Sequence, residues 1–301
     1  MSRAGFIAVA GRPNVGKSTL VNQLVGSKVA VASDKPQTTR RAIRGIVNGE
    51  SEGERYQLVL VDLPGVQRPR DTLTRRMQHR VDRELTDCDA ALLVLNAAEQ
   101  LGPGDRFIAR ALIAAKAPTL IAVNKTDVVG QSDTAETLFG AARLEDAGLN
   151  LHAVFPVSAL TGDGVEALRD GLVSLAPEGP LPYPVEEVTD QPQQQLLAEL
   201  IREQALRRVR EEIPHAVEVE VSEIERRDDL TAVRALLLVE TESQKKILVG
   251  RNGSMVKAIG TAARLELQRS LGNKVHLDLT VKVRRAWRSD EALLDRLGIE
   301  G

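Results

Sequence analysis

Short apolar runs alternate with longer stretches of helical period through residues 5–175. The apolar runs have the length of β-strands: Phe6–Ala10, Leu58–Val61, Ala90–Leu95, Thr119–Val123 and Ala153–Val157. Helical patterns fall between them, at Lys17–Val25, Asp71–Thr86, Asp105–Ala115, Asp133–Asp146 and Val165–Leu175. This alternation predicts an α/β fold, a mostly parallel sheet with helices on both faces. Ile43–Asn48 has no helix before it, which predicts an antiparallel strand at the sheet edge.

The pattern changes after residue 176. Prolines crowd the next segment, at Pro177, Pro180, Pro182, Pro184 and Pro192. Because proline lacks an amide donor and disfavours helix, 177–190 is predicted to be a semi-rigid linker. We therefore expect a first domain at 1–176 and a second domain at 191–301.

The second domain has a different order of elements. Its first helix has one apolar face, formed by Leu196, Leu197, Leu200, Ile201, Leu206 and Val209. Asp190 and Gln193 resemble a capping box at the start of this helix. Strands are predicted at 217–221, 231–241 and 275–283, and Gly250–Gly253 interrupts a helical pattern. The order α-β-β-α-loop-α-β predicts a small α+β domain.

The composition is that of a globular protein of two domains. Of the 301 residues, 43% are apolar and 27% are charged, which excludes a disordered or collagen-like chain. No apolar run approaches the roughly 18 residues of a membrane-spanning helix. The single cysteine, Cys88, can form no internal disulfide, which favours a reducing cytoplasm. The histidines show no metal-binding spacing, and we interpret all of them as structural or surface residues: His79, His152, His215 and His276.

Residues 11–18 have the sequence GRPNVGKS, which fits the phosphate-loop pattern G-x-x-x-x-G-K-[ST]. Gly11 and Gly16 allow backbone amides to point at phosphate oxygens, and the helix that begins here adds the positive end of its dipole. Lys17 would reach the β- and γ-phosphates, and the Ser18 hydroxyl would bind Mg²⁺. The predicted nucleotide-binding set in this segment is completed by Asn14, Val15 and Thr19.

Two further segments are candidates for sensing metal and γ-phosphate. The sequence D-L-P-G at 62–65 follows a predicted strand, at the end where α/β sheets place ligands. Asp62 would bind Mg²⁺ through a water, and the Gly65 amide would meet the γ-phosphate. In Q-T-T-R at 37–40, a threonine could contact both Mg²⁺ and γ-phosphate, and its position favours Thr39 over Thr38. The predicted catalytic residues are Lys17, Thr39 and Gly65, and the predicted metal ligands are Ser18, Thr39 and Asp62.

The sequence N-K-T-D at 124–127 follows another predicted strand and is a candidate base selector. The Asp127 carboxylate can accept both N1–H and N2–H of guanine, whereas it would repel the acceptor N1 of adenine. Asp127 therefore predicts that the site binds GTP in preference to ATP. Asn124 would brace the phosphate loop, Lys125 would cover the base, and the backbone amides of Ser158 and Ala159 could donate to guanine O6.

These segments, in this order, resemble the translation-factor class of P-loop GTPases over residues 5–175. In Ras-like members, a glutamine after the D-x-x-G glycine positions the attacking water, and Val66 stands there in this chain. An apolar side chain cannot orient water, so we expect slow intrinsic hydrolysis, with Gln67 as the next polar candidate. Asn14 resembles the potassium-binding asparagine of related GTPases, which predicts K⁺ beside the phosphates. The alternative interpretation of Asn14 is an ordinary turn residue.

In the second domain, G-R-N-G at 250–253 lies between two predicted helices. It resembles the G-x-x-G loop of KH domains, which clamps the backbone of about four single-stranded nucleotides. A helix C-cap explains Gly250 equally well. The predicted RNA-binding residues are Lys245, Lys246, Gly250, Arg251, Asn252, Gly253 and Lys257.

The net charge of −2 conceals two segments of opposite sign. Residues 182–244 contain seven Lys or Arg against fifteen Asp or Glu, a net charge of −8, and residues 245–288 contain eleven against two, a net charge of +9. A basic face beside an acidic one is typical of polyanion binding, and a solvated helix face is the alternative. Lys282, Arg284 and Arg285 form a basic tail with Trp287, which we interpret as a packing residue.

Segments in both domains resemble the Era family of bacterial ribosome-assembly GTPases. They are Q-T-T-R at 37–40 in the first domain and, in the second, I-R-E at 201–203, E-E-I-P-H-A-V at 211–217, K-K-I at 245–247 and V-K-V at 281–283. The resemblance implies a GTPase domain joined to a type II KH domain that binds 16S rRNA near its 3′ end during 30S subunit maturation. It also implies GTP or GDP with Mg²⁺ as ligands, and a cytoplasmic protein in peripheral contact with the inner membrane. We expect a monomer. Leu63 and Asn252 depart from the family pattern, which has threonine and glycine at these positions.

Two other functions fit parts of the chain. The second domain could be a protein docking module of a GTPase that modifies or repairs something, but the glycines of 250–253 and the +9 segment argue against this. An ATP-using kinase would also carry a phosphate loop, but Asp127 argues against that function.

Overall fold

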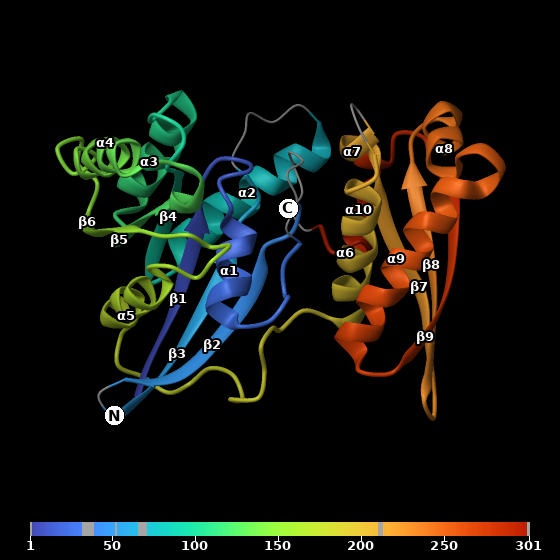
Figure 1. Cartoon of the computed structure of the whole chain (residues 1–301), viewed down its shortest axis with the longest axis horizontal. Helices are drawn as coiled ribbons and strands as arrows, with labels where there is room; N and C mark the ends of the chain where they lie inside the picture. The colour runs from blue at the N-terminus through green and yellow to red at the C-terminus, as the bar shows by residue number, and fades with distance from the viewer. Residues whose placement is uncertain (1, 32–38, 52, 66–70, 210–212, 300–301) are drawn as a thin grey trace.

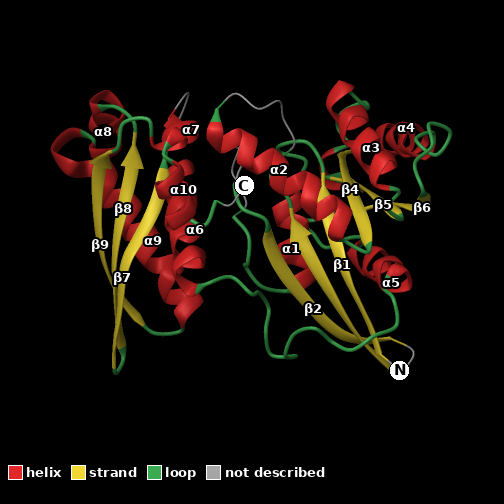
Figure 2. Cartoon of the chain, turned by 180° about the vertical axis from the view of Figure 1, so that it is seen from behind, coloured by secondary structure: helices red, strands yellow, loops and turns green. Residues whose placement is uncertain are grey.

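A computed structural model describes residues 2–31, 39–51, 53–65, 71–209 and 213–299, which form two domains that each have their own sheet (Figure 1). Thr38, Val66 and Gln67 lie outside these described residues. The helices α6 and α10 of the second domain lie between its sheet and the first domain, so the second sheet faces outward (Figures 1 and 2).

The sheet of the first domain has the strand order β2-β3-β1-β4-β5-β6. Its strands are β1 (Ser2–Ala10), β2 (Ile43–Ser51), β3 (Glu54–Asp62), β4 (Ala90–Asn96), β5 (Thr119–Asn124) and β6 (Leu151–Pro156). Only β2 is antiparallel to its neighbour within this sheet, and it lies at the edge. The α/β fold and the antiparallel edge strand are therefore confirmed.

Helices cover both faces of this sheet, which explains why its central strands β1, β4 and β5 carry apolar residues on both faces. The helices are α1 (Lys17–Val25), α2 (Thr72–Asp87), α3 (Pro103–Ala115), α4 (Gln131–Ala142) and α5 (Val165–Leu175). One core packs α1 and α5 against Ile7 and Val9 of β1, and the other packs α2, α3 and α4 against Ala8 and Ala10. Because successive strand residues point to opposite faces, both sets must be apolar.

The second domain is the predicted α+β unit. Its elements are α6 (Gln193–Leu206), α7 (Ile213–Ala216), β7 (Glu218–Arg227), β8 (Leu230–Val239), α8 (Glu242–Val249), α9 (Ser254–Leu271), β9 (Lys274–Val283) and α10 (Glu291–Arg296). β8 is antiparallel to β7 and parallel to β9. Leu197, Leu200 and Ile201 of α6 pack on this sheet with Ile259 and Ala263 of α9, which forms a separate apolar core.

The predicted capping box at the start of α6 is wrong. Pro192 is the N-cap of this helix and makes no side-chain cap bond. The Asp190 carboxylate instead accepts from the Arg44 guanidinium and from the Tyr183 hydroxyl, both at 3.0 Å. The Asp190 carboxylate therefore pairs with Arg44 on β2 and does not cap α6.

The proline-rich segment is bonded to the first domain along β2 and β3. Ile46 donates its amide to the Val188 carbonyl at 2.9 Å, and Gln57 exchanges two hydrogen bonds with the Tyr183 backbone. This segment therefore continues the first domain beyond its last helix before it reaches α6.

The C-terminal residues fold back between the domains. A short 3-10 turn at Trp287–Ser289 leads into α10, an element the sequence did not predict. The buried side chains Trp287, Leu293, Leu294 and Leu297 form an apolar cluster with Leu73 and Met77 of α2. The domain junction is therefore partly apolar. No helix in the described part of the chain is long and apolar enough to cross a membrane.

Candidate functional site

The phosphate loop joins β1 to α1 and places Lys17 beneath it. The Lys17 ammonium donates to the carbonyl oxygens of Gly11 and Arg12, both at 3.0 Å. Gly16 has φ +99°, and a Cβ built on it would lie 2.3 Å from Asn124 Nδ2. Only glycine fits there. Asn124 Nδ2 donates to the Val15 carbonyl at 2.8 Å, so Asn124 braces the loop as the sequence predicts.

Three side-chain oxygens meet beside this loop. Ser18 Oγ donates to Asp62 Oδ2 at 2.6 Å and lies 3.1 Å from Thr39 Oγ1, which is 3.4 Å from the same carboxylate oxygen. Asp62 Oδ1 is buried and has no hydrogen-bond partner among the described residues. Hydroxyl and carboxylate oxygens are the ligands that Mg²⁺ prefers, and it completes its shell with phosphate oxygens and water. The residues present therefore fit Mg²⁺.

Lys17 and Asp62 are buried charges that depend on each other. Burial raises the pKa of Asp62 to about 6, although Lys17 and the Ser18 and Thr39 hydroxyls act to lower it. Burial also lowers the pKa of Lys17 to about 8, against the opposing effect of Asp62. A bound phosphate and a bound cation would favour the charged form of each group, so this arrangement suits a metal-bound nucleotide.

Gly65 lies against the phosphate loop, where the γ-phosphate sensor is predicted. A Cβ on Gly65 would lie 2.9 Å from Pro13 Cγ. The sequence prediction missed a second support of the loop, in which Arg12 Nε donates to Asp105 Oδ1 at 2.8 Å and Arg12 Nη2 donates to Glu99 Oε2 at 2.7 Å. No local signal could have revealed it, because Asp105 lies 93 residues further along the chain.

Asn14 is exposed and has φ +67°, a conformation that asparagine tolerates in tight turns. This backbone is what a turn residue would show, and it leaves the predicted K⁺ role untested. Val15 is buried and Thr19 is half-buried at the start of α1.

The residues predicted to recognise the base meet at the ends of β5 and β6. Lys125 has φ +70°, and Asp127 lies in the following 3-10 turn. The carboxylate of Asp127 is exposed and accepts from Ser158 Oγ at 2.6 Å. This contact orients the carboxylate, and its exposure leaves it accessible to a base.

The predicted donors to guanine O6 differ from the structure. The Ser158 amide donates to the Asp163 carbonyl at 2.9 Å, and the Ala159 amide donates to Asn124 Oδ1 at 2.9 Å. The Ser158 amide is thus used within the turn itself, and the Ala159 amide holds the turn to Asn124 of the N-K-T-D segment. Ser158 Oγ and the Ala159 amide thereby position Asp127 and Asn124, and donation to guanine O6 stays a prediction.

The G-R-N-G loop joins α8 to α9 and is held open by its glycines. Gly250 has φ +72° and caps α8, and a Cβ there would lie 2.7 Å from Met255 Cβ. Gly253 has φ +76° and nothing within 4 Å of the Cβ position. Arg251 and Asn252 between them are exposed, which is the arrangement that lets a loop approach a nucleic-acid backbone.

Cationic side chains lie on the two helices that flank this loop and at the end of β9. Lys246 and Lys257 are exposed on the helices before and after it, and Lys245 is half-buried. Lys282, Arg284 and Arg285 are exposed at the end of β9 and beyond it. Trp287 is 0% exposed and donates Nε1–H to the Ala216 carbonyl at 2.9 Å, so its interpretation as a packing residue is confirmed.

The described residues contain no group of three or more His, Cys, Asp or Glu side chains that could hold a metal ion. A cation at the phosphate loop would therefore depend on two hydroxyls and one carboxylate.

Two known families match this chain. Residues 6–125 match the family described as 50S ribosome-binding GTPase, and residues 212–288 match the KH domain family. The curated GTPase Era of Carboxydothermus hydrogenoformans is 44% identical over 98% of this chain and 97% of its own length. GTPase Era of Mycolicibacterium paratuberculosis is 46% identical, with 98% of each chain covered.

Two solved structures resemble the whole chain. Aquifex aeolicus Era, in a variant form bound to GDP and AlF4⁻, superimposes with a TM-score of 0.93 at 32% identity and covers 99% of this chain and all of its own. Era in complex with MgGDPNP and nucleotides 1506–1542 of 16S ribosomal RNA has the same TM-score and identity and covers 100% of both chains. With this fold, this pair of sites and this identity over nearly the full length, the chain belongs to the Era family of GTPases.

Proposed function

We propose that this protein is a GTP-hydrolysing switch that binds 16S rRNA near its 3′ end and assists maturation of the 30S ribosomal subunit. One observation carries the proposal: a single chain holds a buried lysine, two hydroxyls and a carboxylate at a phosphate loop, and an exposed G-x-x-G loop on a KH domain. The Era structure that binds MgGDPNP and a 16S rRNA fragment supports the same ligand classes here.

Hydrolysis in such a site requires positioning and charge stabilisation more than covalent chemistry. Lys17 and the loop amides would neutralise charge on the β- and γ-phosphates. Ser18, Thr39 and Asp62 would hold Mg²⁺, which supplies further positive charge to the phosphate oxygens. The Gly65 amide would donate to the γ-phosphate, and Asp127 would hold guanine.

We also propose that K⁺ binds at Asn14 and adds positive charge beside the phosphates. The exposed position of Asn14 in the loop supports this role. We expect the hydrolysis rate to fall about tenfold or more when KCl is replaced by NaCl, because the added charge would stabilise the transition state. An Asn14→Ala variant should be slow in both salts. A native rate that is equal in the two salts would contradict the role.

The experiment that tests the proposed function is binding to an RNA of the sequence of 16S nucleotides 1506–1542. Binding is measured by fluorescence anisotropy with GDP and with GDPNP, at low and at moderate salt. We expect tight binding that depends on the nucleotide, because a switch must give its two states different RNA affinities.

Weak binding that ignores sequence and disappears with salt would mean that the basic face is only an electrostatic patch. In that outcome, the second domain is better explained as a protein docking module. A shuffled RNA of the same length is the matched control.

We further propose that the protein is a cytoplasmic monomer in peripheral contact with the inner membrane. The resemblance to the Era family supports this proposal. Sedimentation of the purified protein, alone and with vesicles of bacterial lipids, tests it.

A further inference from the structure

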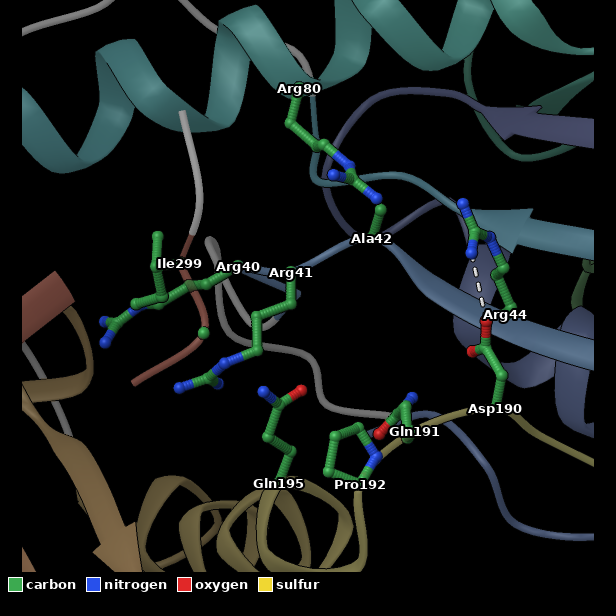
Figure 3. Close-up of a pocket in the computed structure, with 11 residues that line it drawn as sticks. Arg40, Arg41, Ala42, Arg44, Arg80, Asp190, Gln191, Pro192, Gln195 and Ile299 are labelled. Carbon is green, nitrogen blue, oxygen red and sulfur yellow. Dashed lines mark hydrogen bonds and ion pairs between the residues drawn. The ribbon is translucent and has the colours of Figure 1, made fainter. Parts of the chain in front are cut away.

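Three consecutive residues, Thr39, Arg40 and Arg41, connect the metal-binding oxygens to the second domain. Thr39 Oγ1 lies beside Ser18 and Asp62 in the first domain. The next two side chains extend from the first domain toward the second, along a cavity of about 210 Å³ at the domain junction (Figure 3). Within the described residues, their guanidinium groups donate to carbonyl and carboxylate oxygens of the second domain.

Arg40 is held at the beginning of β7. Its Nη1 donates to the Val217 carbonyl and to Glu218 Oε2, both at 2.8 Å, and its Nη2 donates to the His215 carbonyl at 2.9 Å. The guanidinium carbon lies 5.3 Å from the centroid of the Trp287 ring, within the range of a cation–π contact. Arg40 is 2% exposed, so its side chain is buried at the junction against residues of the second domain.

Arg41 is held in the same interior from a different direction. Its Nε donates to the Leu297 carbonyl at 2.6 Å, Nη1 pairs with Glu199, and Nη2 lies 3.4 Å from Glu218 Oε1. Arg202 shares both carboxylates, at 2.7 Å from Glu199 and 3.8 Å from Glu218. The buried cluster therefore contains three arginines and two glutamates, which we call the junction cluster.

We propose that Arg40 and Arg41 are positioning residues of the nucleotide site, through which the second domain holds Thr39 at the metal. Adjacent Cα atoms are only about 3.8 Å apart, so a threonine that precedes two buried anchors cannot move independently of them. Buried ion pairs resist opening because an unpaired charge would remain in the interior. The docked second domain is thus a part of the nucleotide site.

This inference rests on the proposed function, because it requires that the site binds GTP. It adds that the contribution of the second domain is specific to the triphosphate. Thr39 is placed to contact metal and γ-phosphate, and GDP has no γ-phosphate. Loss of the anchors should therefore weaken binding of the triphosphate and leave binding of GDP almost unchanged.

The test compares the affinities of full-length variants for fluorescent GDPNP and GDP in the presence of Mg²⁺. Arg41→Met removes one anchor and leaves two arginines facing two glutamates, so the charge of the junction cluster balances. Glu218→Gln removes a partner of both anchors without changing any atom of the first domain. For each variant we expect the GDPNP affinity to fall about tenfold, the effect of one charge-assisted hydrogen bond, and the GDP affinity to change by less than about twofold.

Asp295→Asn is the matched control. It removes an ion pair of the same domain junction, in which Arg76 Nη1 lies 2.5 Å from Asp295 Oδ1. Neither residue is adjacent to Thr39 in sequence. We expect this variant to keep the native ratio of the two affinities.

An unchanged ratio in Arg41→Met and Glu218→Gln would overturn the inference, and so would equal losses for GDP and GDPNP. If Glu218→Gln does not fold, Arg41→Met decides alone, and its GDP affinity reports that the first domain is intact. Failure of the native protein to bind either nucleotide would instead refute the proposed function, which keeps the two failures distinct.

Discussion

Gly16 shows how strongly the nucleotide site depends on a single side chain being absent. The Asn124 amide occupies the place where a Cβ would be, and it holds the loop through the Val15 carbonyl. The backbone at Gly16 also has a positive φ, which an L-residue adopts at a cost. A side chain at residue 16 would therefore both clash with Asn124 and strain the backbone.

We expect Gly16→Ala to lower the affinity for GDP and GDPNP by roughly 10- to 100-fold, because it displaces Asn124 from the loop and strains the backbone. Calorimetric titration with each nucleotide measures this loss. Gly26→Ala is the matched control, since Gly26 also has a positive φ, of +75°, but has nothing within 4 Å of the Cβ position. A similar loss of affinity in both variants would mean that strain alone is responsible.

Asp127 is the residue that should decide which base is bound. Asp127→Asn replaces a double acceptor by a group that can also donate, which matches the carbonyl at C2 of xanthine. We expect the GTP affinity to fall about 100-fold or more while xanthosine triphosphate becomes the preferred ligand. Competition between the two nucleotides measures the preference. Unchanged GTP affinity would contradict the role of Asp127.

At the scale of elements, two loops that each precede a helix are placed to bind phosphate groups, one those of a nucleotide and the other those of RNA. The phosphate loop leads into α1, and the G-R-N-G loop leads into α9. In both, a glycine with a positive φ precedes the first helical residue, Gly16 in one and Gly253 in the other. Their surroundings differ, because the first loop is braced by buried side chains and the second is open.

The open surroundings of Gly253 allow a clean test of the second loop. Gly253→Asp adds a negative charge where the RNA backbone is expected, and the structure has room for the side chain. We expect RNA affinity to fall by about tenfold or more, from like-charge repulsion, with GTP hydrolysis unchanged.

Gly253→Asn is the matched control for this substitution. It adds a neutral side chain of similar size, and asparagine tolerates the left-handed conformation. Anisotropy with the 16S fragment and a phosphate-release assay measure the two activities. Loss of both activities in the aspartate variant would indicate unfolding instead of repulsion.

At the scale of the whole molecule, most ion pairs described at the domain junction join a cation of the first domain to a carboxylate of the second. Lys28 Nζ lies 2.6 Å from Glu203 Oε2 and 3.2 Å from Glu266 Oε2. Among the described residues, further ion pairs across the junction join Arg40 to Glu218, Arg41 to Glu199 and Glu218, Arg76 to Asp295, and Arg288 to Asp71. The negative charge of 182–244 thus contributes to docking the domains, which leaves the cations around the G-R-N-G loop exposed.

The junction cluster predicts that the stability of the fold decreases in acid. Burial acts to raise the pKa of Glu218, but Arg41, Arg202 and Arg40 outweigh it and lower this pKa from 4.5 to about 2. A carboxyl whose pKa is lower in the folded state contributes its full stabilisation above its unfolded pKa. This contribution is lost as the pH falls toward the folded pKa.

We expect Glu218→Gln to lower the free energy of unfolding by about 3–5 kcal/mol at neutral pH, the cost of breaking a buried ion pair. The difference between the native chain and the variant should decrease steadily below pH 4.5. Urea unfolding from neutral pH down to pH 3 measures it. A difference that stays constant over this range would show that Glu218 is not ionised in the fold.

The sequence by itself determined the α/β fold, the antiparallel edge strand, the phosphate loop and the N-K-T-D and G-x-x-G motifs. These features are local, because a phosphate loop needs only contiguous residues between a strand and a helix, and a buried strand shows its apolar run directly. The tertiary structure decided that Asp190 pairs with Arg44 instead of capping α6, and that the amides of Ser158 and Ala159 are already bonded.

Only the tertiary structure could reveal how the two domains are connected. Arg40 and Glu218 are 178 residues apart, and Arg41 lies 256 residues from the Leu297 carbonyl that it binds. A charged residue in a sequence carries no sign of which opposite charge it will meet, because that choice follows from the docking of two domains around a common apolar cluster. The sequence therefore shows where the charged residues stand along the chain, and the tertiary structure determines which of them pair.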